Sequence, residues 1–278
     1  MPLLHQFYVY DAWQLYYHLY LPVNYRREQA TPLLFVLHGG ASDGNGMIKL
    51  TDGGFNRLAD EYNFMVCYPD GIGRYNRQNS PRALAHADAE VFRGLLSSLA
   101  SYYTIDQRRV FVTGLSDGGN MAYRLACDLP DEIAGIAAVA ALMPTQLTPT
   151  RPMPVLFIAG TEDPMVPYKG GAVGGRLLQR GTVRSAMETL RVWSEANRCG
   201  GEPTTELLDD VDPHDRMSVQ QTFYRDCVAS VMMYTIIGGG HTWPGGKQYL
   251  DEKIIGRTSR DIDANRVIWD FFRGLHHE

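Results

Sequence analysis

One serine of this 278-residue chain lies between two glycines in the stretch VFVTGLSDGGNMAYRLA, residues 110–126. The β-branched run before Gly114 predicts a strand, and the run after Gly118 predicts a helix. Where a strand passes directly into a helix, a side chain two positions before or after the turn residue would clash. Glycine at both positions removes that clash, so Ser116 is expected in a strained turn that exposes its hydroxyl as a nucleophile. The alternative is an ordinary glycine-rich turn in which the serine only caps the helix.

A nucleophilic serine requires a histidine base and a carboxylate that orients the histidine, in the chain order serine, acid, histidine for this kind of turn. The apolar run VLFIAG is followed by Glu162 and Asp163, of which only one can face the site. We favour Asp163, because it precedes Pro164, where the chain is extended and leaves the strand. Of the eight histidines, only His241 follows a late apolar run in a glycine-rich loop. Ser116, Asp163 and His241 are therefore expected to form a catalytic triad.

The negative charge that develops on the attacked carbonyl oxygen needs two backbone N–H donors. One is expected from Asp117, the residue after the nucleophile. The other is expected from the loop after the apolar run LLFVL, which reads His38-Gly39-Gly40-Ala41. The sequence leaves open whether Gly40 or Ala41 donates. The alternative for the stretch GGASDGNG is a phosphate-binding loop, but it lacks the Gly-Lys-Ser/Thr ending of such a loop.

The elements that must position these residues are predicted by an alternation of short apolar runs and longer amphipathic segments. Six apolar runs have the length of strands: 33–37, 64–68, 110–114, 136–142, 155–160 and 231–237. Uninterrupted apolar runs are typical of parallel strands that are buried on both faces. The alternation predicts the α/β class, with a mostly parallel sheet covered by helices on both faces. We expect one domain over residues 1–278.

Two further segments show clear patterns. Apolar residues from Ala264 to Leu275 follow helical spacing, and Thr258 with Asp261 offers a capping box for that helix. A second helix is expected from Val183, with Thr182 as its cap. The runs QFYVY and LYYHLYLP near the start of the chain predict an opening β-hairpin around Asp11 and Ala12.

Charge and hydropathy exclude several function classes. The formal net charge is −5 and no Lys/Arg-rich run is present, so nucleic acid is not an expected partner. No apolar run approaches about 18 residues, and the start lacks the pattern of a secretion signal; we expect a soluble chain and no membrane partner. The acidic turn DDVDPHD, residues 209–215, lacks the glycine and distal glutamate of a calcium loop, so no metal is expected. The oligomeric state has no signal in the sequence.

Five blocks carry a resemblance to a known family, in the same order and over most of the chain from residue 33 onward. They are LHGGASDG, YPDGIGR, IDQRRVFVTGLSDGGNMAYRLAC, GTEDPMVPYKGG and GGGHTWPGG. Together they resemble the polyhydroxybutyrate depolymerase and feruloyl esterase group of α/β-hydrolases. The resemblance implies the α/β-hydrolase fold and a serine carboxylic ester hydrolase without a cofactor. It also implies Ser116 as nucleophile, Asp163 as acid and His241 as base.

The substrate is less well defined by this resemblance. We expect a small or aromatic ester of feruloyl or cinnamoyl type; the alternatives are polyhydroxybutyrate or its oligomers, and a catalytically silent fold used for binding. The chain shows no Ser/Thr-rich linker or appended binding domain, which favours soluble esters over a crystalline polyester. Many family members have a tryptophan in the loop after YPDG, where this chain has Tyr75 as its nearest aromatic residue. Tyr75 is therefore the residue of this loop that is expected to contact the substrate. Trp243 either stacks on a substrate ring or packs under its loop.

The four cysteines fall into two groups. The resemblance implies a disulfide between Cys199 and Cys227, which would favour an extracellular location, with the cytoplasm as the alternative. Cys67 and Cys127 lie in apolar segments and are expected to be small buried hydrophobic residues.

Overall fold

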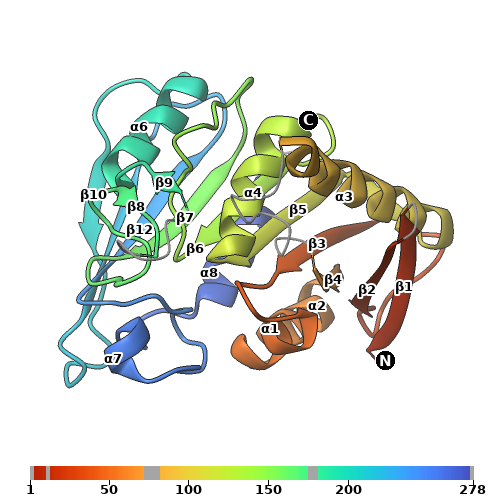
Figure 1. Cartoon of the computed structure of the whole chain (residues 1–278), viewed down its shortest axis with the longest axis horizontal. Helices are drawn as coiled ribbons and strands as arrows, with labels where there is room; N and C mark the ends of the chain where they lie inside the picture. Colours follow the sequence, from red (N-terminus) through yellow and green to blue (C-terminus); the bar gives the residue numbers. More distant parts are fainter. Residues whose placement is uncertain (1–2, 11–12, 72–81, 175–180, 276–278) are drawn as a thin grey trace.

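A ten-stranded sheet forms the centre of the described part of the chain, in the order β1-β2-β4-β3-β5-β6-β7-β12-β11-β10 (Figure 1). This computed structural model describes residues 3–10, 13–71, 82–174 and 181–275. The parallel strands are β4 (Met65–Pro69), β3 (Thr31–Leu37), β5 (Ile105–Leu115), β6 (Gly135–Val139), β7 (Val155–Gly160) and β12 (Val231–Ile237). All six expected apolar runs therefore lie in or overlap parallel strands, and the expected α/β class is confirmed.

Antiparallel strands extend the sheet on both sides. On one side are β1 (Leu4–Tyr10) and β2 (Trp13–Tyr20), and on the other β11 (Ser218–Phe223) and β10 (Thr204–Leu207). The β1–β2 pair is the expected opening hairpin. A separate two-stranded sheet joins β8 (Gly171–Ala172) to β9 (Thr182–Val183).

Successive residues of the parallel strands face two different helical layers. In β3, Leu33 and Phe35 belong to one core cluster and Leu34 to the other, as the two-residue period of a strand requires. The first cluster contains side chains of α3 (Arg82–Tyr102), α4 (Asp117–Asp128) and α6 (Ala186–Ala196). The second contains side chains of α1 (Gly44–Leu50), α2 (Gly54–Tyr62) and α8 (Ala264–Arg273). Figure 1 shows α4 and α6 in front of the sheet and α8 behind it. Helices thus cover both faces of the sheet.

Both expected helix caps are wrong. The N-cap of α8 is Asp263, whose side chain accepts a hydrogen bond from a backbone N–H of the first turn, and not Thr258. The N-cap of α6 is Ser185, whereas Thr182 belongs to β9. Ser, Thr and Asp residues are frequent before both helices, and only the path of the chain decides which of them adjoins the first helical residue. None of the helices within the described residues is long and apolar enough to cross a membrane.

The register of the sheet brings the carboxyl ends of the parallel strands to one edge. Leu115 of β5 pairs with Val139 of β6, and Val139 pairs with Ile158 of β7. Ile158 in turn pairs with Tyr234 of β12. The segments after β5, β7 and β12 therefore leave the sheet at the same edge, which is where open α/β sheets bind ligands.

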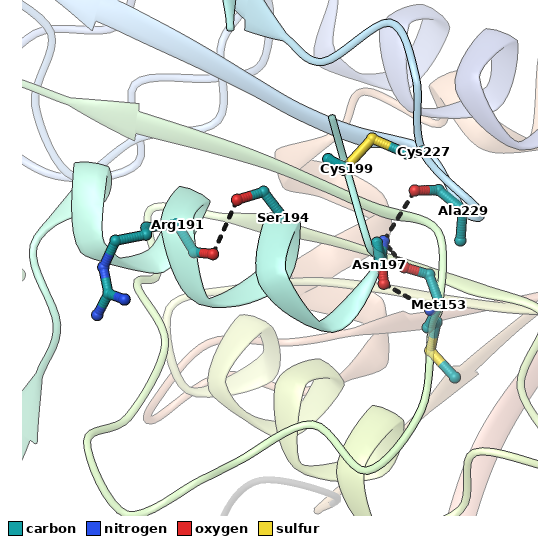
Figure 2. Close-up of a disulfide and its surroundings, with 7 residues drawn as sticks. All are labelled: Met153, Arg191, Ser194, Asn197, Cys199, Cys227 and Ala229. Carbon is teal, nitrogen blue, oxygen red and sulfur yellow. Dashed lines mark hydrogen bonds between the residues drawn. A yellow bond between two sulfur atoms is a disulfide. The ribbon is translucent and has the colours of Figure 1, made fainter. Parts of the chain in front are cut away.

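A disulfide joins Cys199 to Cys227 beyond the C-terminal end of α6 (Figure 2). Next to it, the Asn197 side chain donates hydrogen bonds to the carbonyl oxygens of Met153 and Ala229, and accepts one from the Met153 N–H. These contacts attach the end of α6 to the segments that precede β7 and β12. The expected disulfide is confirmed. Cys67 and Cys127 are free and buried, as expected.

Removing this disulfide is expected to lower the free energy of unfolding by about 3 kcal/mol, because the bond restricts the unfolded chain more than the folded one. The two cysteines are 28 residues apart in sequence. The double variant Cys199→Ser, Cys227→Ser would be compared with the unchanged protein by urea unfolding, with and without reductant. Reductant should destabilise the unchanged protein and leave the variant as it was. Equal urea midpoints for the variant and the unchanged protein in the absence of reductant would contradict the prediction.

Candidate active site

Ser116 connects the last residue of β5 to the first residue of α4. Its backbone has φ 55° and ψ −114°, in a region that residues other than glycine rarely occupy. The turn is held by hydrogen bonds from the Ser116 N–H to the Val139 carbonyl and from the Asn120 N–H to the Ser116 carbonyl, both 2.9 Å long. Ser116 occupies the N-cap position, yet its side chain makes no capping hydrogen bond. The hydroxyl is therefore not used to cap α4, and the strained turn is typical of functional positions.

The two glycines that flank Ser116 allow backbone segments to touch. A Cβ atom on Gly114 would lie 2.6 Å from the Gly118 carbonyl carbon and 2.8 Å from the Leu37 carbonyl oxygen. A Cβ atom on Gly118 would lie 2.7 Å from the His38 carbonyl oxygen and closer still to that of Leu37. The start of α4 thus packs directly against the end of β3, as the clash argument from the sequence requires.

Replacing Gly118 by alanine is expected to destabilise the protein by about 3 kcal/mol, because the new methyl group would collide with the backbone of Leu37 and His38. Gly200→Ala is the matched control, since a Cβ there would be 3.8 Å from its nearest neighbour. Thermal unfolding of both purified variants gives the comparison. A Gly118→Ala protein as stable as the control would show that α4 can be displaced at little cost.

His241 and Asp163 form a buried hydrogen-bonded pair. The His241 Nδ1–H donates to Asp163 Oδ2 at 2.7 Å, and each side chain is 2% exposed. The second carboxylate oxygen, Oδ1, accepts the backbone N–H groups of Met165 at 2.7 Å and Val166 at 2.8 Å. Both oxygens of the carboxylate are thus held, and the imidazole is oriented with Nε2 as the nitrogen that can accept a proton. Glu162, the other acid that the sequence offered, is exposed.

Close backbone contacts at glycine residues hold the loop of His241 against the end of β7. A Cβ atom on Gly160, the last residue of β7, would collide with the carbonyl oxygen of Gly239, and one on Gly240 would collide with Gly256. The His241 N–H donates to the Ile255 carbonyl oxygen. β7 stands nearer than β12 to β5, so this packing shifts His241 toward the strand that carries Ser116.

Tyr249 supports the backbone of His241, a role that no pattern in the sequence indicated. Its hydroxyl donates to the His241 carbonyl oxygen at 3.0 Å. Tyr249 is 39% exposed as a whole, but desolvation of its hydroxyl and the nearby charge of Asp163 raise the pKa of Tyr249 to about 12, so the hydroxyl keeps its proton at neutral pH. It lies in an irregular loop before α7 (Glu252–Ile255), where neither periodicity nor turn residues mark it.

The loop expected to supply the second oxyanion donor lies beside the serine. A Cβ atom on Gly39 would be 3.7 Å from the Ser116 Cβ and 3.5 Å from the Leu115 carbonyl oxygen. The Ser42 N–H donates to the Gly39 carbonyl at 3.3 Å, which closes a tight turn around Gly40 and Ala41. Ala41 has φ 58°, a left-handed conformation that is unfavourable for alanine. Asp117, the other expected donor, is the first residue of α4.

Of the two residues expected to contact substrate, Trp243 and Tyr75, the structure describes only Trp243. Trp243 is fully buried, and its ring packs edge-on against Phe55 with centroids 5.9 Å apart. This favours the packing role, one of the two alternatives left open for Trp243. Tyr75 lies outside the described residues. Within the described ranges, no group of three or more His, Cys, Asp or Glu side chains could hold a metal ion.

Known families and proteins similar to this chain are esterases. The family described as "Esterase PHB depolymerase" matches residues 15–146. "Putative esterase NocK" of Nocardia uniformis subsp. tsuyamanensis is 30% identical over 261 residues, which cover 88% of this chain and 75% of that protein. "Feruloyl esterase B" of Piromyces equi is 28% identical over 83% of this chain, but this match covers only 43% of the relative.

Two further similarities are partial or confined to the fold. "Poly(3-hydroxybutyrate) depolymerase" of Ralstonia pickettii is 32% identical over 130 residues, which cover 42% of this chain and 26% of that protein. The solved structure of an acetyl xylan esterase from Aspergillus awamori matches with a TM-score of 0.58 at 15% identity, over 93% of this chain and 94% of the other. The structural match supports the α/β-hydrolase fold.

Proposed function

Since the chain belongs to the esterase PHB depolymerase family, which consists of carboxylic ester hydrolases, we propose that it cleaves small or aromatic esters through an acyl-serine intermediate. The observation that carries this proposal is the buried hydrogen bond between His241 and Asp163 at the sheet edge where Ser116 follows β5. A buried imidazole with a carboxylate on Nδ1 is arranged to accept a proton on Nε2.

In the proposed mechanism, Ser116 Oγ attacks the ester carbonyl carbon while His241 Nε2 takes the hydroxyl proton. Asp163 stabilises the imidazolium that results. The tetrahedral oxyanion accepts hydrogen bonds from the Asp117 N–H and from the N–H of Gly40 or Ala41. When the intermediate collapses, the alcohol leaves with the proton from His241. A water molecule, with His241 again as base, then attacks the acyl-serine and releases the acid and Ser116.

Labelling with a fluorophosphonate tests the nucleophile directly, because such probes phosphonylate only an activated serine. We expect one adduct per chain, located on Ser116 by peptide mapping, and no adduct on heat-denatured protein. An adduct on another serine, or a folded protein that stays unlabelled, would overturn the assignment of Ser116.

The aromatic substrate class is supported by the relative named feruloyl esterase B, and the depolymerase relative supports 3-hydroxybutyrate oligomers as the alternative. Rates on methyl ferulate, methyl cinnamate, p-nitrophenyl butyrate and a 3-hydroxybutyrate trimer would rank the two classes. Higher kcat/KM for the trimer than for methyl ferulate would make the oligomers the preferred class. The Cys199–Cys227 disulfide further supports an oxidising, extracellular compartment.

A further inference from the structure

His38 is a buried histidine directly after β3, in the loop that lies beside Ser116. It is 1% exposed, and both ring nitrogens are engaged by backbone groups. Nδ1 lies 2.7 Å from the Gly39 carbonyl oxygen. Nε2 lies 3.0 Å from the Gly71 N–H, which belongs to the loop after β4. The imidazole therefore joins two loops that leave neighbouring parallel strands at the same sheet edge.

These two partners define the protonation state of His38. A carbonyl oxygen only accepts, so Nδ1 must carry a proton; a backbone N–H only donates, so Nε2 must lack one. The ring is thus neutral, in the Nδ1–H tautomer. A proton on Nε2 would place two hydrogen-bond donors, the ring N–H and the Gly71 N–H, opposite each other, and the bond between them would be lost. Asp70, the residue before Gly71, is held in place, because its N–H donates to the Tyr16 carbonyl and its carboxylate accepts the Gly44 N–H, each at 2.7 Å.

The bond to the Gly39 carbonyl also orients the next N–H. The Gly39 carbonyl and the Gly40 N–H belong to one planar trans peptide and point in opposite directions. The His38 imidazole and the Ser42 N–H both hold this carbonyl, so the direction of the Gly40 N–H is held with it. Gly39 itself lies against Ser116.

We propose that His38 is a positioning residue that, as a neutral Nδ1–H imidazole anchored by Gly71, aims the Gly40 N–H as the second oxyanion donor. The inference rests on the proposed function, and it selects Gly40 between the two donors that the sequence left open. His38 takes no proton from substrate; it acts through the backbone of its own loop. Its effect is confined to the transition state, where the oxyanion exists.

Three variants separate the two hydrogen bonds. Asparagine can place an amide N–H near the position of Nδ1 and keep the bond to Gly39, whereas glutamine can reach Gly71 but lacks that donor; alanine lacks both. We expect His38→Ala and His38→Gln to lower kcat for p-nitrophenyl butyrate by about 10-fold to 100-fold. KM should change less than about threefold. The kcat of His38→Asn should lie between those of these two variants and that of the unchanged protein. A trifluoromethyl ketone, which forms a tetrahedral oxyanion on serine, should bind His38→Ala and His38→Gln more weakly by a similar factor. His214→Asn, at an exposed histidine, is the control and should match the unchanged protein.

The tautomer can be measured without a variant, by two-bond ¹⁵N–¹H correlation spectra of the protein labelled on histidine nitrogen. We expect the Nδ1–H form of His38 at neutral pH; the Nε2–H form would overturn the proposal even if the alanine variant fails to fold. Unchanged kcat and ketone affinity in His38→Gln, with turnover that still depends on Ser116, would overturn the role of His38 alone. Turnover that does not depend on Ser116 would overturn the proposed function and this inference together.

Discussion

Replacing Ser116 by alanine is expected to lower kcat for p-nitrophenyl butyrate by at least about 10⁴-fold, because in the proposed mechanism the Ser116 Oγ is the atom that forms the acyl intermediate. KM should change little, since the attacking oxygen stabilises the transition state rather than the bound substrate. The variant should fold normally, because the hydroxyl makes no capping hydrogen bond to α4 and alanine tolerates the same backbone conformation about as well as serine. Initial rates with both purified proteins and a thermal unfolding curve for each would check these expectations.

Ser101→Ala provides the control, because that serine is exposed near the end of α3 and its hydroxyl donates to the Ser98 carbonyl of the same helix. Its rate should equal that of the unchanged protein. Activity of the Ser116→Ala protein within about tenfold of the unchanged rate would mean that another residue is the nucleophile. A loss of activity together with a loss of fold would point to a structural role of the hydroxyl instead.

Replacing Asp163 by asparagine is expected to lower kcat by about 10⁴-fold while leaving the loop intact. The asparagine oxygen can still accept the N–H groups of Met165 and Val166, which hold the turn after β7. Its amide nitrogen would then face His241 Nδ1 in place of the carboxylate oxygen. Because an amide nitrogen donates, Nδ1 must become the acceptor and the proton moves to Nε2. In that tautomer His241 cannot take the proton of Ser116.

The neighbouring acid gives the matched control for this substitution. Glu162→Gln makes the same change of carboxylate to amide one residue earlier, on an exposed side chain. We expect its kcat and its thermal stability to equal those of the unchanged protein. If Glu162→Gln lost activity and Asp163→Asn kept it, the roles of the two acids would have to be exchanged.

Local features of the sequence were sufficient to predict the strands and the turn at Ser116. The apolar runs that become the parallel strands are short, uninterrupted and buried on both faces, so the pattern within each run was informative by itself. The glycines at positions 114 and 118 lie within five residues of chain, and the clash that they avoid follows from turn geometry. The order of serine, acid and histidine along the chain then left few candidates for the other two roles.

Contacts between distant residues were decided only in the tertiary structure. Asp163 and His241 are 78 residues apart, and the packing of their loops, rather than any local pattern, brings the two side chains together. For the same reason Trp243 and Tyr249 could not be assigned from their neighbours in sequence. The first is buried against Phe55 of α2, and the second reaches back to the His241 carbonyl.

The sequence by itself therefore determined the α/β class, the parallel strands and the position of the strained turn at Ser116, since periodicity and short-range sterics act within a few residues. The tertiary structure alone decided which helix caps are used, which acid meets His241 and which backbone groups hold His38. The caps depend on where the chain enters each helix, and His38 and Gly71 are 33 residues apart. Those choices depend on how whole elements pack against one another, and no single stretch of the chain contains that information.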